Sequence, residues 1–485
     1  MSPLSPGSSP NRHALRPYRK ETVLTLAALV CAVLVYGLLH QRYYVAYVDD
    51  AWCVSQTHFF FDTGKTEDIL FRAVGAPDRV LVFAKTFFYV YGGVLSRFGW
   101  TKSNAHLLSA LFMWLSAGTW FFICRRLNFS PALQKLIPIS MLLFPAYFSA
   151  GNLARYDAMV FFLSSLTFLS FLSGQYFLTG LILVVSLESH PLGITGAFYI
   201  VAYLLHDKRA AFGDRRGLFA AIGSFAAGSA IALAYVVWIH ADVTLDRFLT
   251  TLAVNSNMND FRFGFIVKYF TRSYWYRDVW ELPLIGAALF LYIRHRLWQR
   301  HGFIAILLVL AIVESFVVSR PNANYMVFAY PAFSLLMFVT FEERRLLGKL
   351  VPAMVAALLA VYGFTYALNR GYDFDRVVAE TRATLADEAL PVIGMPDNWF
   401  AVPERQFYSI YHSVNYVPSL GLKDFYLVRN DYISDQSNNY EALIATLNKT
   451  HTCVPLRSFS AFNDAFNDQT VDVFRCVARS HRGEH

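Results

Sequence analysis

The sequence predicts an α-helical polytopic membrane protein with a small C-terminal α+β extracytoplasmic domain. The chain of 485 residues is 56% hydrophobic and only 16% charged, whereas soluble proteins carry about 25% charged residues. Apolar runs long enough to cross a bilayer recur along most of the chain. After residue 368 the pattern changes to an amphipathic helix and short strands, which indicates a separate domain.

Eleven apolar segments are the predicted spans of a transmembrane module covering residues 21–368. Two of them, 176–188 and 192–205, are shorter than the roughly 20 residues of a full crossing, so a half-depth hairpin is the alternative there. Both arrangements leave the orientation of the later spans unchanged. In chain order the segments are 21–40, 104–124, 131–150, 156–173, 176–188, 192–205, 217–239, 281–293, 302–318, 325–340 and 350–368.

The basic residues predict the orientation of the spans, because cytoplasmic loops are rich in Lys and Arg. The basic N-terminal tail, residues 1–20, is expected in the cytoplasm, and every later basic cluster then falls in a cytoplasmic loop. The outer face receives two long loops, 41–103 and 240–280, and a periplasmic domain, 369–485. The later basic clusters are Arg125, Arg126 and Lys135; Lys208, Arg209, Arg215 and Arg216; Arg294, Arg296 and Arg300; and Arg344, Arg345 and Lys349.

One further segment, 80–98, is also long enough to span the membrane. If it did, Arg125, Arg126 and all later basic clusters would move to the outer face, against the positive-inside rule. Lys85 and the Gly92-Gly93 pair also interrupt the segment. We therefore expect a juxtamembrane or re-entrant helix at the outer face.

Two cysteines of the C-terminal domain, Cys453 and Cys476, would lie in an oxidising compartment if this domain is outside the cell membrane. A disulfide between them and two unpaired buried thiols are the two alternatives. The five cysteines of the chain form no Cys-x-x-Cys pair, so no zinc site is implied.

An acidic doublet, Asp49 and Asp50, follows the first predicted span and is surrounded by Tyr and Trp. Carboxylates at a membrane boundary are costly to place, which favours a functional role. A carboxylate can take a proton from a hydroxyl, and aromatic rings can pack on a sugar. The alternative is a pair of solvated loop acids.

Other polar residues gather on the same predicted outer face, near the ends of spans. Arg and Lys suit the phosphate of a lipid, so together with the acids they indicate transfer of a sugar from a lipid phosphate. The alternatives are an Arg155–Asp157 pair at a helix start, a snorkelling Lys85, and a polar hairpin tip at Glu188 and His190. The residues are Arg79, Lys85, Arg155, Asp157, Glu188, His190 and Arg320.

Two short motifs, in this order and on one face, carry a resemblance to the GT-C class of membrane glycosyltransferases. Asp49-Asp50-Ala51-Trp52 is similar to the Asp-Glu-Ala-Tyr of the protein O-mannosyltransferase and aminoarabinose transferase branch, and Asp49 matches the acid taken as catalytic. Ala154-Arg155-Tyr156-Asp157 matches an Asp-containing loop after the third span. Asp50 departs from the usual Glu. The resemblance covers about 370 residues in architecture.

The resemblance implies a polyprenyl-phosphate-linked sugar as donor, used outside the membrane. We expect an inverting glycosyltransferase of the bacterial inner membrane that acts on a hydroxyl of a lipid, glycan or protein. Asp49 is the expected general base, and Asp50 and Asp157 are further catalytic candidates. The expected donor-phosphate or substrate-binding residues are Lys85, Arg155, Glu188, His190, Arg320 and Tyr325.

No cofactor and no metal are required by this expectation, and the lipid-linked sugar is a co-substrate. A divalent ion held by Asp49 and Asp157 is the alternative, by resemblance to oligosaccharyltransferases of the same class. Nucleic acid is not an expected partner, because the basic residues lie in short loops between spans. A transporter or lipid flippase is the rival function, and a non-catalytic scaffold is a third; the chain shows no repeated halves.

Overall fold

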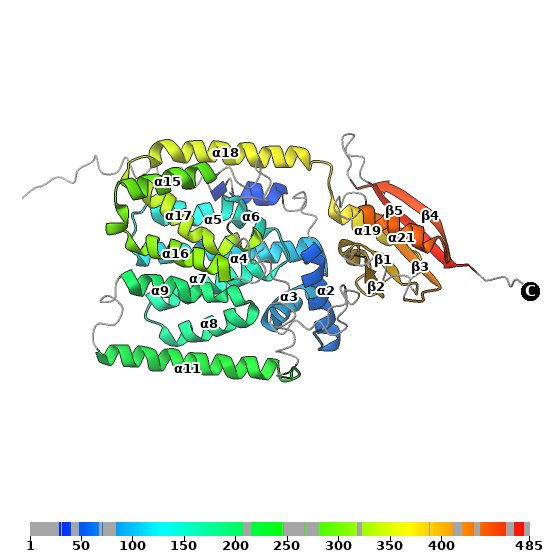
Figure 1. The fold of residues 1–485 in the computed structure, drawn as a ribbon, viewed down its shortest axis with the longest axis horizontal. Coiled ribbons are helices and arrows are strands. Elements are labelled where there is room, and N and C mark those ends of the chain that lie inside the picture. Colours follow the sequence, from blue (N-terminus) through cyan, green and yellow to red (C-terminus); the bar gives the residue numbers. More distant parts are fainter. Residues whose placement is uncertain are drawn as a thin grey trace, which may run out of the picture.

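The computed structural model describes residues 29–30, 32–39, 48–66, 70, 84–206, 215–244, 246, 266, 281–317, 323–387, 389–410, 420–430, 437–461 and 470–479. Within these residues a helical body is joined to a smaller domain that contains a sheet, and the two lie side by side along the longest axis of the molecule (Figure 1). The last long helix of the helical body ends at Leu368.

The helical body contains long and short helices in the following order. They are α2 (Val48–Thr63), α3 (Lys85–Phe98), α4 (Lys102–Arg126), α5 (Leu133–Leu143), α6 (Pro145–Gly151), α7 (Tyr156–Leu172), α8 (Tyr176–Ser189), η1 (Pro191–Ile194), α9 (Thr195–His206), α11 (Arg215–Ile239), α15 (Leu282–Arg294), η2 (Leu297–Gln299), α16 (Gly302–Val317), η3 (Ala323–Tyr325), α17 (Met326–Glu343) and α18 (Leu347–Leu368). The described residues between 29 and 39, within the first expected span, are also helical.

Four described helices are long and apolar enough to cross a membrane: α4, α11, α17 and α18. The pair α5 and α6, bent by 59° at Phe144, would make a fifth span. Shorter apolar helices occur at α7, α8, η1 with α9, α15 and α16. The many-spanning helical architecture is therefore supported, whereas the expected count of eleven spans is not confirmed within the described part of the chain.

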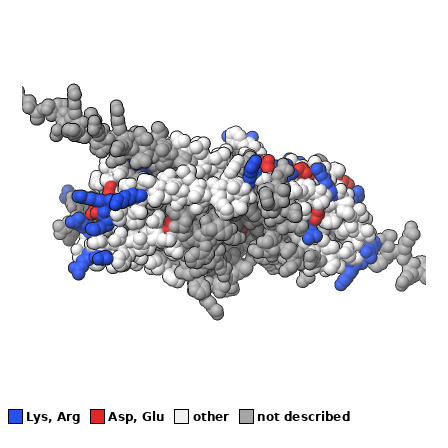
Figure 2. Space-filling model, turned by 90° about the horizontal axis from the view of Figure 1, so that it is seen from above, with Lys and Arg blue, Asp and Glu red and all other residues white. Residues whose placement is uncertain are grey.

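Lys and Arg gather at the two ends of the molecule on the face shown in Figure 2, and the described surface between them is mostly uncharged. One of these ends carries the C-terminal domain. This distribution suits a body that crosses a bilayer with its helices along the long axis. The segment 85–98, which forms α3, has 14 residues, about 21 Å of helix, and is too short for a full crossing.

The C-terminal domain has the small α+β architecture that its strand-like segments predict. Its five-stranded sheet has the order β2-β1-β3-β5-β4. The first three strands are parallel, and β5 runs antiparallel to β3 and β4. The elements are α19 (Phe374–Thr384), β1 (Val392–Gly394), η4 (Pro396–Ala401), β2 (Phe407–Ser409), β3 (Asp424–Asn430), α21 (Ser437–Leu447), β4 (His451–Ser460) and β5 (Thr470–Ala478).

Cys453 and Cys476 face each other across β4 and β5 and form a disulfide. Of the two alternatives that the sequence left open, the structure has the paired form. The cysteines Cys53 and Cys124 remain free and buried in the helical body.

The C-terminal domain meets the helical body at α2, against which η4 packs. The side chain of Asp397 on η4 is buried at this junction, with 4% of its surface exposed. Since α2 begins with the acidic doublet, the domain contacts the helix that carries the first expected site residues.

Candidate active site

Arg155 joins the two acidic motifs that the sequence singled out. It is the residue before α7, and its guanidinium donates from Nη1 to Asp49 and from Nε to Asp157 Oδ2 over 2.7 Å. The side chains of Arg155 and Asp157 are 2% and 1% exposed, whereas that of Asp49 is 26% exposed. Asp49 is therefore the member of this group that remains open to solvent.

Aromatic rings pack close to the guanidinium of Arg155. Its central carbon lies 5.3 Å from the ring centre of Tyr156 and 5.7 Å from that of Tyr325. The ring of His190 stacks on Tyr156 with centres 4.4 Å apart and lies 5.4 Å from Tyr325. Aromatic faces attract a cation, so these rings help to hold Arg155 in place. Two expected site residues, His190 and Tyr325, thus belong to the Arg155 group.

Asp157 has a further property that suits a functional site. Its Oδ1 atom is buried without a hydrogen-bond partner among the described residues. A buried carboxylate oxygen normally has a donor. With two acids and one Arg, the group of Asp49, Arg155 and Asp157 carries one negative charge in excess when both acids are ionised, so it would accept a proton or a hydroxyl donor.

Asp50 points into the protein, and none of its side chain is exposed. Its Oδ1 accepts a hydrogen bond from the Ala154 N–H over 2.6 Å, and its Oδ2 lies 2.9 Å from His106 Nε2 and 3.4 Å from Lys102 Nζ. Burial raises the pKa of Asp50, but the charges of His106 and Lys102 and the two hydrogen bonds outweigh burial and hold this pKa below its ordinary value.

The geometry of Asp50 favours a positioning role over the catalytic role expected from its place in the doublet. Its oxygens are occupied by Ala154, His106 and Lys102, and they have no route to a substrate through exposed surface. Lys102 and His106 come from the first two turns of α4, where a four-residue spacing puts them on one face of the helix.

Lys85 and Glu188 form a second polar group, at the junction of α3, α8 and α11. Lys85 Nζ donates to the carbonyl oxygen of Ile239 over 2.8 Å and pairs with Asp242. Glu188 accepts from the backbone N–H groups of Lys85 and Thr86 over 2.8 and 3.2 Å, and from His240 Nε2 over 2.9 Å.

These contacts give Glu188 a structural role. Its carboxylate takes two of the orphan N–H groups at the start of α3, as a capping side chain does. Ala84, just before α3, has a φ of 78°, and its N–H donates to the carbonyl oxygen of Glu188 over 2.8 Å. Lys85 is only 2% exposed, so it would reach a donor phosphate only by leaving Asp242. Arg79 and Arg320 lie outside the described residues.

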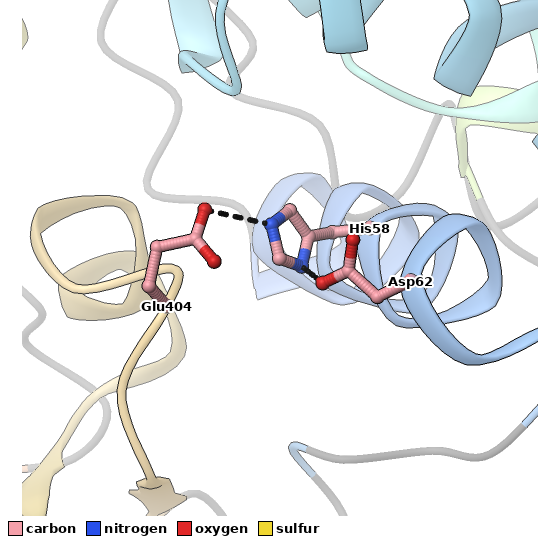
Figure 3. Close-up of side chains that lie close together, drawn as sticks. All are labelled: His58, Asp62 and Glu404. Atoms are coloured by element: carbon pink, nitrogen blue, oxygen red, sulfur yellow. Dashed lines mark hydrogen bonds and ion pairs between the residues drawn. The ribbon is translucent and has the colours of Figure 1, made fainter.

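Among the described residues, one cluster of side chains could hold a metal ion, and Figure 3 shows it. His58 Nδ1 lies 3.2 Å from Asp62 Oδ2, and His58 Nε2 lies 3.2 Å from Glu404 Oε1. Asp62 and Glu404 approach opposite nitrogens of the His58 ring, so an ion bound to either nitrogen would be contacted by only one of the two acids. Ion pairs therefore fit this cluster better than a metal. At the alternative pair, Asp49 and Asp157, the Arg155 guanidinium lies between the carboxylates, where a cation would bind.

Sequence reasoning missed three polar residues around the doublet: Lys102, His106 and Asp397. The first two carry a signal, because Thr101 caps α4 by accepting from Asn104 N–H over 3.1 Å, and Lys102 and His106 follow with helical spacing. Asp397 carries no such sequence signal, because it belongs to the C-terminal domain.

No family model matches this chain, and no curated protein matches its sequence. Solved structures match its fold. Apo ArnT from Cupriavidus metallidurans is 15% identical with a TM-score of 0.55, over 94% of this chain and 98% of that chain. The same protein bound to undecaprenyl phosphate gives 15% identity and a TM-score of 0.53, over 92% and 97%.

A third structure is archaeal. The oligosaccharyltransferase AglB from Archaeoglobus fulgidus, in complex with an inhibitory peptide and a dolichol-phosphate, is 12% identical with a TM-score of 0.52, over 90% of this chain and 73% of that chain. Identities this low show the fold alone. The chain therefore shares its fold with ArnT and AglB, both GT-C glycosyltransferases, which confirms at the level of the fold the resemblance that the two acidic motifs predicted.

Proposed function

We propose that this protein is an inverting glycosyltransferase that moves a sugar from a polyprenyl-phosphate donor to a hydroxyl acceptor at the outer face of the bacterial inner membrane. The observation that carries the proposal is the partly exposed carboxylate of Asp49, held by the buried Arg155 beside Asp157. The fold supports the donor class, because the similar structures include ArnT with undecaprenyl phosphate and AglB with a dolichol-phosphate.

In this mechanism Asp49 is the general base. It takes the proton of the acceptor hydroxyl while the oxygen attacks the anomeric carbon from the side opposite the phosphate, so the C–O bond to the lipid phosphate breaks with inversion. Arg155 fixes the orientation of Asp49. Asp157 offsets the positive charge of Arg155, so the group of Asp49, Arg155 and Asp157 keeps a net negative charge when both acids are ionised.

The leaving phosphate ester needs a cation rather than a proton donor. Arg155 and Lys85 are each 2% exposed and paired with acids, so neither offers a free charge to the lipid in this conformation. Arg320 therefore becomes the leading candidate for the phosphate among the basic residues expected to bind it. The acceptor can be a lipid, a glycan or a protein.

The direct test is sugar transfer by purified protein in nanodiscs, with a panel of radiolabelled polyprenyl-phosphate sugars. Asp49→Asn is expected to lower kcat by about a thousandfold, because a missing general base costs about 100- to 10,000-fold. Asp424→Asn, which breaks an exposed ion pair between β3 and β5 of the C-terminal domain, with Arg475, is the matched control. Undiminished transfer by Asp49→Asn would exclude this residue as base.

Two further measurements separate the proposal from its rivals. A topology reporter fused after residue 127 is expected to read as cytoplasmic, which keeps α2 and the doublet on the outer face; an exported reporter would overturn this orientation. Movement of the lipid-linked sugar across proteoliposomes without transfer would instead favour a flippase.

A further inference from the structure

The C-terminal domain contributes charged and aromatic groups to the layer directly behind the acidic doublet. Asp397 Oδ2, on η4, lies 3.6 Å from Lys102 Nζ, which in turn lies 3.4 Å from Asp50 Oδ2. The same ammonium group lies 4.5 Å above the ring of Phe374, at the start of α19. One buried cation of the helical body is thus shared between the doublet and the C-terminal domain.

A second link joins α2 to the C-terminal domain, two turns of α2 beyond Asp50. His58 of α2 pairs with Glu404 over 3.2 Å, as Figure 3 shows. Trp100 and Trp399 each make a T-shaped contact with the His58 ring, with ring centres 4.7 and 5.7 Å away. The domain therefore contacts α2 directly at His58 and is linked, through Lys102 of α4, to Asp50 near the start of α2.

We propose that Asp397 is a positioning residue of the active site: by holding Lys102, it holds Asp50, and through Asp50 it sets the placement of Asp49 against Arg155. This inference rests on the proposed function. It makes the C-terminal domain a structural part of the catalytic site in addition to any part it takes in binding the acceptor.

The chain of contacts is continuous and buried. Asp397 is 4% exposed, Lys102 6% and Asp50 0%. The 3.6 Å between Asp397 Oδ2 and Lys102 Nζ is an ion-pair distance. Charges in such surroundings interact strongly, because little water screens them.

The physical consequence of losing Asp397 follows from this sharing. Without Asp397, Lys102 would keep Asp50 as its acid partner and would move towards it. Lys102 would then compete with the Ala154 N–H for the carboxylate of Asp50. Since Ala154 precedes Arg155, and Asp49 precedes Asp50, a shift there displaces both members of the Asp49–Arg155 ion pair. Burial and the nearby Asp50 raise the pKa of Asp397, and Lys102 opposes this rise, which agrees with a carboxyl group that depends on Lys102.

The test compares Asp397→Asn, Lys102→Met and the double variant of the full chain in nanodiscs. Each single variant is expected to lower kcat by about tenfold, the scale of one coupling between contacting charged groups, with KM for the donor changed less than about twofold. The double variant is expected to be no slower than Lys102→Met, because Asp397 acts through Lys102. Asp397→Glu is expected to restore part of the rate, and Asp424→Asn leaves kcat unchanged.

A second readout does not depend on catalysis. Cys53 lies on α2, one turn after Asp49, and is 2% exposed. We expect N-ethylmaleimide to label it faster in Asp397→Asn than in the unaltered protein, as measured peptide by peptide by mass spectrometry. If the unaltered protein transfers no sugar, the proposed function fails, and Cys53 protection still decides this inference.

The proposal is overturned by any of three results. The first is an Asp397→Asn variant that keeps the kcat and the Cys53 protection of the unaltered protein. The second is a double variant in which the two losses multiply, because Asp397 would then act independently of Lys102. A variant that loses only thermal stability, at unchanged kcat in the folded fraction, also contradicts a positioning role.

Discussion

The backbone N–H of Ala154 donates a hydrogen bond to Asp50 over 2.6 Å, and this bond joins the two acidic motifs of the candidate site. Asp50 follows Asp49 on α2, and Ala154 precedes Arg155 at the start of α7. The bond therefore fixes the backbone on both sides of the Asp49–Arg155 ion pair. It is consistent with the different roles proposed for the two neighbouring acids: the partly exposed Asp49 would meet the substrate, and the buried Asp50 would hold the two backbone segments together.

This division of roles predicts different outcomes for the two acids. Asp50→Asn leaves Lys102 and His106 without the charge that both contact, and breaking a buried ion pair costs about 3 kcal/mol or more. Asp49→Asn leaves Arg155 with Asp157 as partner and is expected to cost about 1 kcal/mol. Thermal unfolding of the two purified variants measures the difference. Equal melting temperatures would contradict a structural role for Asp50.

The pH dependence of stability is a second prediction, with opposite signs for two acids. The pKa of Asp50 lies below its ordinary 3.8, so its ionised form stabilises the fold above that pH, and this contribution is lost as the pH falls through the lowered pKa. The pKa of Asp397 lies above 3.8, so its contribution is fully present below that pH and is lost as the pH rises through the raised pKa.

Unfolding between about pH 3 and pH 7 measures both effects. Relative to Asp397→Asn, the unaltered protein is expected to lose stability as the pH rises above about 4. Relative to Asp50→Asn, it is expected to lose stability as the pH falls below about 4. If the stability curves of the unaltered protein and of one variant stay parallel over this pH range, the pKa shift of the acid replaced in that variant is contradicted.

The meeting of Asp49 and Asp157 is predictable from the sequence, because both acids adjoin span ends that the charge pattern puts on one face. The partners of Lys85 and Glu188 are not predictable from the sequence. Asp242 and His240 follow the end of α11, and no local pattern links that point to α3 or α8. A cation at a span end has the same sequence signature whether it binds phosphate or an internal acid.

The role of the C-terminal domain is also beyond sequence reasoning. Its strands and helices have local signatures, and its architecture agrees with them. The burial of Asp397 beside Lys102 depends instead on how η4 packs on α2, which is a tertiary contact between distant segments. A short Pro-Asp-Asn stretch reads as an ordinary turn when its neighbours are unknown.

The disulfide provides a third prediction. Cys453 and Cys476 close a loop with a sequence separation of 23 residues, so their bond is expected to stabilise the C-terminal domain by about 3 kcal/mol in the chain-entropy model. Replacing both with Ser should lower the melting temperature and make it insensitive to dithiothreitol. The bond is also expected in protein isolated from cells with thiols blocked. Free thiols there would contradict a periplasmic location of this domain.

The contact between α8 and α11 supplies a fourth prediction, with a control in the same helix. A Cβ atom on Gly180 would overlap the carbonyl oxygen of Phe225, and one on Gly228 would overlap that of Phe177. Backbones that approach so closely in a membrane need small residues at the contact. Gly223, also in α11, has no atom within 4 Å of such a Cβ. We therefore expect Gly228→Val to lower the folded yield and the melting temperature, while Gly223→Val leaves both nearly unchanged.

The same contact bears on the polar group formed by Lys85 and Glu188. Because α11 ends at Ile239, whose carbonyl oxygen accepts from Lys85, separating α11 from α8 would also move Asp242 and His240 away from Lys85 and Glu188. Gly228→Val is therefore expected to expose α3 to proteolysis, whereas Gly223→Val is not. Equal protection of α3 in the two variants would show that Lys85 and Glu188 hold this helix without help from the α8–α11 contact.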